Sequence, residues 1–114
     1  DAVAWTNGWV ASGSWDKRVR LWKEGKYEDE VCVLHDAGDR VVKVGFSSDA
    51  KYLAATTQHG GLLVWSLSPQ TLCSLHLHIP YTDRARLSTF SWHPTSPVIA
   101  AGGSRSGRVM IVDI

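Results

Sequence analysis

The sequence predicts an all-β protein in which one small antiparallel sheet is repeated along the chain. Residues 10–22 and 53–65 follow one pattern: a strand of small residues, a polar turn, and a second strand that ends on tryptophan. A weaker third copy covers residues 99–112 and ends on valine. The final residues of the three copies are 43 and 47 positions apart. A period of about 40 residues made of short strands is typical of β-propeller blades, which contain about four antiparallel strands each.

The first blade is predicted to contain four strands, and its third strand has the clearest pattern. Val19 and Leu21 share one face of that strand and Arg20 and Trp22 share the other, which is the period of a strand with one covered face. A hairpin turn is expected at residues 6–8, because asparagine and glycine tolerate positive φ. The strands are predicted at residues 2–5, 9–14, 18–23 and 31–35.

The second and third blades contain strands that are expected to be buried on both faces. Residues 62–65 and 109–112 are continuously apolar, as in strands covered on both sides by neighbouring sheets. The strands are predicted at residues 41–47, 52–57, 62–66 and 72–77, and then at 87–92, 98–102 and 108–114, so that the third blade lacks its outermost strand.

These strands divide the chain into blades at about residues 1–35, 36–78 and 79–114, which form a single partial domain. A propeller of seven such blades needs roughly 300 residues, whereas this chain has 114. Three blades cannot close a ring, so apolar faces are expected at both ends. The simplest interpretation is a fragment of a longer protein whose remaining blades cover those faces. A natural 114-residue protein would need partners or further copies of itself.

The copies resemble the repeats of the WD-repeat β-propeller family. In that family the third strand of a blade ends in Trp-Asp, and an aspartate six residues before the tryptophan lies in the preceding turn. Trp22 and Asp16 have this spacing in the first copy. The resemblance implies that Ser14, Asp16 and Trp22 form a hydrogen-bonded network that is structural, with the carboxylate accepting from donors at a tight turn.

The second copy departs from the family pattern at the turn position. It keeps Trp65 but has His59 where the aspartate is expected, and Asp36 and Asp39 lie in the upstream loop. A reversed pair of His59 with one of these acids is one interpretation, and a solvated His59 is the other. The third copy lacks both the tryptophan and the turn aspartate.

Composition excludes several classes of function. A net charge of +1 with 20% charged residues predicts no general attraction to nucleic acid or to anionic membranes. No apolar run approaches the roughly 20 residues of a membrane span, and no segment resembles a signal peptide.

Cys32 and Cys73 are expected at the same position of consecutive outer strands, too far apart for a disulfide. Free thiols predict a reducing compartment, either cytoplasm or nucleus.

Catalytic and metal sites are not predicted. His76 and His78 share one strand face, but no cysteine or acid cluster supplies the further ligands that zinc requires. No phosphate-binding glycine loop, no Gly-x-Ser-x-Gly elbow and no nucleophile with its base is present. We therefore expect a protein without enzyme activity, cofactor or metal.

Basic residues and one tryptophan gather in loops that open on one end of the ring, the surface where partners of this family commonly dock. An exposed Trp15 beside cations suits an interface anchor, although its ring could equally fold back onto the neighbouring loop. These features predict a scaffold that mediates protein–protein interaction within a larger intracellular complex. The alternative is a nucleic-acid-associated propeller that uses the same basic rim. The candidate surface comprises Trp15, Lys17, Gln58, Arg84, Arg86 and Arg105.

Overall fold

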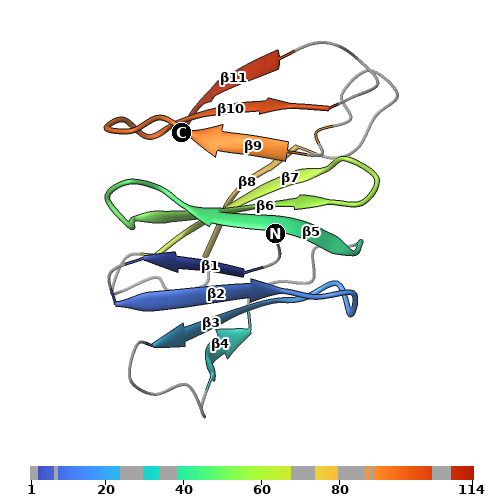
Figure 1. Ribbon diagram of the computed structural model, residues 1–114, viewed down its shortest axis with the longest axis vertical. Coiled ribbons are helices and arrows are strands. Elements are labelled where there is room, and N and C mark those ends of the chain that lie inside the picture. Colours follow the sequence, from blue (N-terminus) through green and yellow to red (C-terminus); the bar gives the residue numbers. More distant parts are fainter. Residues whose placement is uncertain are drawn as a thin grey trace.

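Three small antiparallel sheets make up the part of the protein that the structure describes. The computed structural model describes residues 3–6, 8–23, 30–33, 39–67, 74–79, 87, 89–103 and 109–114. These residues form eleven strands and no helix, and the three sheets lie one above another in Figure 1. The predicted fold class, propeller blades of antiparallel strands in a ring that is not closed, is therefore confirmed.

Each sheet follows the chain, so that every strand pairs with the next one in sequence. All eleven strands lie within two residues of their predicted bounds. The first sheet contains β1 (Val3–Thr6), β2 (Trp9–Gly13), β3 (Val19–Lys23) and β4 (Glu30–Val33). The second contains β5 (Val41–Phe46), β6 (Tyr52–Thr57), β7 (Leu62–Ser66) and β8 (Ser74–Ile79), and the third contains β9 (Thr89–Trp92), β10 (Val98–Gly102) and β11 (Val109–Asp113).

The three sheets pair their central strands in equivalent registers. Trp22 of β3 lies opposite Val10 of β2, and Trp65 of β7 lies opposite Leu53 of β6. In the third sheet Val112 occupies the same place, opposite a residue of β10. The repeat in the sequence is thus a repeat in the structure, and residues can be compared between blades position by position.

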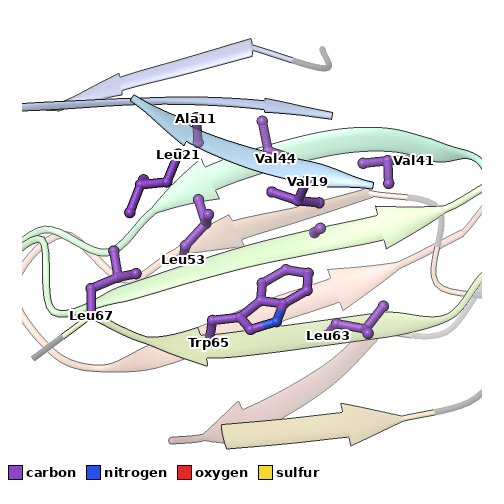
Figure 2. Close-up of a cluster of buried hydrophobic side chains, with 10 residues drawn as sticks. Ala11, Val19, Leu21, Val41, Val44, Leu53, Leu63, Trp65 and Leu67 are labelled. Atoms are coloured by element: carbon purple, nitrogen blue, oxygen red, sulfur yellow. The ribbon is translucent and has the colours of Figure 1, made fainter. Parts of the chain in front are cut away.

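The core lies between the sheets, and the second sheet contributes to both sides of it. Leu53 and Trp65 belong to a buried cluster shared with the first sheet (Figure 2), whereas Ala54 and Val64 belong to a second cluster shared with the third sheet. Successive residues of a strand point to opposite faces. The continuously apolar β7 is therefore buried on both faces, as its sequence predicts.

Neighbouring sheets approach each other closely. A Cβ atom on Gly13 would collide with the side chain of Val41, so a larger residue there would push the first two sheets apart. The inner strands β5 and β9 are also joined by polar contacts: the Lys43 ammonium donates to the Phe90 carbonyl at 2.7 Å. These contacts join neighbouring blades through their strands.

The outer faces of the first and third sheets meet no other sheet in the described chain. Trp5 of β1 is 65% exposed and Ile111 of β11 is 66% exposed. Ile111 lies at the register position of Leu21 and Val64, which are fully buried. The apolar run of β11 predicted burial on both faces, and within the described residues this expectation is wrong, because no sheet covers its outer side.

The thiol prediction stays untested by the fold. Cys32 lies in β4, but its side chain and the whole of Cys73 are outside the described part of the chain.

Candidate interaction surface

The candidate surface lies at one end of the sheets, where two equivalent turns meet the segment that leads into β5. Residues 14–18 connect β2 to β3, and residues 58–61 connect β6 to β7. Backbone bonds tie both turns to the leading segment: Val41 N donates to Ser14 O at 3.2 Å, and Gln58 N donates to Arg40 O at 2.9 Å. We call the exposed residues of this region the turn surface: Trp15, Asp16, Lys17, Arg18, Arg40, Gln58 and His59.

The two turns share their backbone geometry but not their residues. Ser14 N donates to Arg18 O, and the equivalent bond in the second blade runs from Thr57 N to the carbonyl of residue 61. Lys17 has a φ of 72°, and Gly60 at the same position has a φ of 99°. Glycine adopts this left-handed conformation without steric cost, whereas lysine does not.

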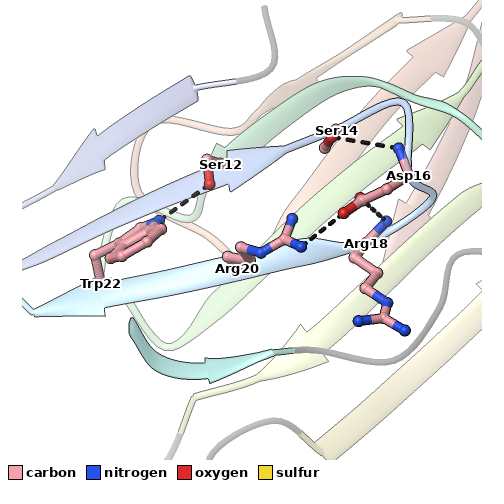
Figure 3. Close-up of polar contacts among 6 residues, drawn as sticks. All are labelled: Ser12, Ser14, Asp16, Arg18, Arg20 and Trp22. Carbon is pink, nitrogen blue, oxygen red and sulfur yellow. Dashed lines mark hydrogen bonds and ion pairs between the residues drawn. The ribbon is translucent and has the colours of Figure 1, made fainter. Parts of the chain in front are cut away.

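Asp16 organises the first turn through its two carboxylate oxygens (Figure 3). Oδ1 accepts from Arg18 N at 3.0 Å, and Oδ2 accepts from Arg20 Nη2 at 2.6 Å. The hydroxyl of Ser14 accepts from Asp16 N at 3.3 Å. The hydrogen bond from Arg20, followed by that from the Arg18 backbone, outweighs desolvation and lowers the pKa of Asp16 to about 2.

The structure brings Ser14 and Asp16 together but places Trp22 elsewhere. The Trp22 indole N–H donates to Ser12 Oγ at 3.0 Å. The predicted network of Ser14, Asp16 and Trp22 is therefore wrong for Trp22. Trp22 lies opposite Val10, and Ser12 is the residue two positions further on the same face of β2. The register therefore brings the indole to the strand and not to the turn, and Asp16 takes Arg20 as its partner instead.

Trp65 has no counterpart to that hydrogen bond. Its indole nitrogen is buried and meets no hydrogen-bond partner within the described structure. The register places Ala55 in the second blade where Ser12 stands in the first. Alanine has no acceptor, so the second blade contains a buried donor that is unpaired.

His59 forms the reversed pair with Asp39. Asp39 Oδ2 accepts from the His59 backbone at 2.8 Å and lies 2.7 Å from His59 Nδ1, while Oδ1 accepts from Arg40 N at 2.7 Å. Partial burial works to raise the pKa of Asp39, but the bonds from His59 and Arg40 hold it below its ordinary value. The interpretation of a paired histidine is confirmed for Asp39, and Asp36 lies outside the described residues.

Trp15 combines the two arrangements that its sequence left open. The Arg40 guanidinium carbon lies 4.3 Å from the centroid of the Trp15 ring, so the ring does contact the neighbouring loop. The side chain is nevertheless 73% exposed. Lys17 and Gln58 are also exposed. Three further candidates, Arg84, Arg86 and Arg105, lie outside the described residues.

Sequence reasoning did not assign Arg20, Arg40 or Ser12 their roles. Arg20 lies at the position of the buried Leu63 of the second blade, and a charged residue at an apolar repeat position is a signal that it has a partner. Ser12 could have been found from the register of the hairpin. Arg40 gave no such signal, because its contact crosses between two blades.

The described residues of this surface contain no cluster of metal ligands. No group of three histidine, cysteine, aspartate or glutamate side chains within that part of the chain could hold a metal ion. The same part of the chain contains no helix with the length and hydropathy that crossing a membrane requires. The surface offers instead an aromatic ring, several cations and exposed backbone turns.

Comparison with known proteins identifies the repeat. Residues 2–23 match the WD40 family, described as WD domain, G-beta repeat. The matched residues contain β1, β2 and β3, so this part of the first blade is similar to a WD40 repeat. Such repeats are typically non-catalytic scaffolds that mediate protein–protein interaction.

The fold is also found among solved structures, whereas no curated protein matches the sequence at a significant level. The crystal structure of the computationally designed Ika8 protein superposes with a TM-score of 0.79 at 17% identity, over 98% of this chain and 32% of that one. At this identity the likeness concerns the fold alone. The chain spans about a third of the length of the designed protein.

Proposed function

We propose that this chain is a non-catalytic scaffold that binds a protein partner through the turn surface. The observation that carries the proposal is the indole of Trp15, which is 73% exposed and yet stacked by Arg40 from the neighbouring blade. Tryptophan and arginine are the side chains that most often dominate interface energies. A ring that already has a packed neighbour loses less conformational freedom on binding than a free one.

The loop that carries Arg40 is itself fixed in place. Asp39 accepts hydrogen bonds from the backbone of Arg40 and from His59, and Gln58 N donates to Arg40 O. The stacking residue therefore stands on a segment with several backbone constraints. Such preorganisation favours Trp15 as a docking residue over a surface tryptophan that no neighbour holds in place.

The assembly that we propose is intracellular, either cytoplasmic or nuclear, and contains further protein subunits. A nucleic-acid-binding role would use the same cations, but Asp16 and Asp39 lie in the same region. These carboxylates would oppose the continuous phosphate backbone of a nucleic acid. A protein partner, which presents separate charges, fits the surface better.

Site-specific photo-crosslinking in cells tests the proposal. A benzophenone amino acid placed at Gln58 should form crosslinks to protein that survive nuclease treatment and disappear when Trp15→Ala is added. The same probe placed at Thr95, an exposed residue of the turn at the opposite end of the third sheet, serves as the control. Equal crosslinks from Thr95, or crosslinks that nuclease removes, would contradict the proposed function.

A further inference from the structure

The turn surface has an excess of positive charge that the whole chain lacks. The chain has 12 lysines and arginines against 11 aspartates and glutamates. When Arg20 of β3 and Asp39 are counted with the turn surface that they contact, by contrast, four cations accompany two carboxylates. These residues are Lys17, Arg18, Arg20 and Arg40, with Asp16 and Asp39.

Both carboxylates of this region are already occupied by donors. Asp16 accepts from the Arg20 guanidinium and from the Arg18 backbone. Asp39 accepts from His59 and from the backbone of Arg40. Neither carboxylate neutralises the remaining side-chain cations by direct contact.

Three cations of the turn surface keep their side-chain donors available. Lys17, Arg18 and Arg40 are exposed, and their side chains donate no hydrogen bond within the described chain. Figure 3 shows the Arg18 guanidinium directed away from the Asp16 carboxylate, which accepts from the backbone N–H of Arg18 and not from its side chain. Each of these side chains can therefore pair with an anion on a partner without breaking an existing bond.

Arg40 has a geometry suited to a carboxylate. Its guanidinium carbon lies over the Trp15 ring, 4.3 Å from the ring centroid. Stacking uses the face of the planar group and leaves its N–H edge free, and that edge matches the two oxygens of a carboxylate. An aromatic surface and a bidentate anion site thus lie side by side.

We infer that the turn surface binds an acidic segment of a protein partner. Carboxylates of the segment pair with Arg40, Lys17 and Arg18, and an apolar side chain next to them packs on the exposed ring of Trp15. This inference rests on the proposed function and adds the chemistry of the partner. It favours separate carboxylates over a phosphate backbone because Asp16 and Asp39 interrupt the positive surface.

Peptide display on the full chain tests the inference. A random dodecapeptide library is selected on immobilised wild type, and peptides that also bind Trp15→Ala are removed. The remaining peptides should be enriched in aspartate and glutamate next to an apolar residue. Enrichment in basic or neutral peptides would overturn the inference but leave the proposed function intact, whereas the absence of any Trp15-dependent peptide would overturn both.

A charge-reversal pair checks the contacts directly. Lys17→Glu should weaken the affinity for a selected acidic peptide about tenfold at low salt. Lys51→Glu, which reverses an exposed lysine in the turn at the other end of the second sheet, should change it by less than about twofold. Matching circular dichroism spectra establish that both variants are folded. Equal losses in the two variants would overturn the inference, as would displacement of the peptide by a single-stranded oligonucleotide at equal concentration.

Discussion

Restoring the missing acceptor of Trp65 should stabilise the protein. The indole N–H of Trp65 is buried without a hydrogen-bond partner in the described chain, whereas that of Trp22 donates to Ser12 Oγ at 3.0 Å. Because the registers are equivalent, Ala55 occupies the position of Ser12. We expect the substitution Ala55→Ser to place a hydroxyl oxygen within reach of the unpaired indole.

The size of the expected stabilisation follows from the burial of the unpaired Trp65 indole N–H. A buried donor without a partner costs about 1–3 kcal/mol, and a neutral hydrogen bond contributes about 1 kcal/mol net. Ala55 is fully buried, so the new hydroxyl must also leave water, and the net gain should be about 1 kcal/mol. For a domain of this size that gain raises the unfolding temperature by about 4 °C. Ser12→Ala should lower the stability by a similar amount.

Urea denaturation followed by tryptophan fluorescence measures both changes at one fixed protein concentration. A double-mutant cycle of Ala55→Ser with Trp65→Phe isolates the new bond, because phenylalanine has no donor. The gain from the serine should vanish in the phenylalanine background. A stabilisation that persists there, or a destabilised Ala55→Ser protein, would refute the assignment of Ala55 as the cause of the unpaired donor.

Three further predictions concern the turns and the open faces. Because the pKa of Asp16 is lowered to about 2, the contribution of this carboxylate to stability should be complete above about pH 4 and lost as the pH falls toward 2. The urea midpoints of wild type and Asp16→Asn should therefore converge over that range. A difference between the two midpoints that stays constant with pH would contradict this expectation. Lys17 has the left-handed φ of Gly60, so Lys17→Gly should raise and Gly60→Ala should lower the free energy of unfolding by about 1 kcal/mol each; urea midpoints that move the other way would exclude backbone strain. Ile111 is 66% exposed on an open face, so the chain should sediment as oligomers that Ile111→Asp disrupts; a monodisperse wild-type monomer would count against unpaired blade faces.

The fold could be predicted because the information for it is local. Alternation along β3 and the continuous apolar run of β7 predict one covered face and two covered faces respectively, and the equivalent ends at Trp22 and Trp65 set the blade period. Strand bounds followed from turn residues between these runs. Burial of β11 could not be predicted in the same way, because it depends on which sheet lies beyond it.

The candidate site was predicted in part, and the reason lies in contacts between segments. Trp15 and Lys17 could be placed on the surface because they lie in a tight polar turn. The stacking of Arg40 on Trp15 joins two blades, so no spacing within one repeat encodes it. The partner of Trp22 was misassigned because the network was placed on Ser14, whereas the strand register brings the indole to Ser12.

The central claim, that Trp15 on the turn surface is the docking residue, can be tested by nuclear magnetic resonance. The chain has six tryptophans, whose indole N–H signals are resolved and assigned by single substitutions in a nitrogen-15 correlation spectrum. On titration with a Trp15-dependent acidic peptide, the indole signal of Trp15 should shift in proportion to saturation, while that of Trp92, which donates to the Gly45 carbonyl between two inner strands, stays in place. A Trp15 signal that does not move while the signal of Trp5 on the open face of the first sheet does would contradict the account.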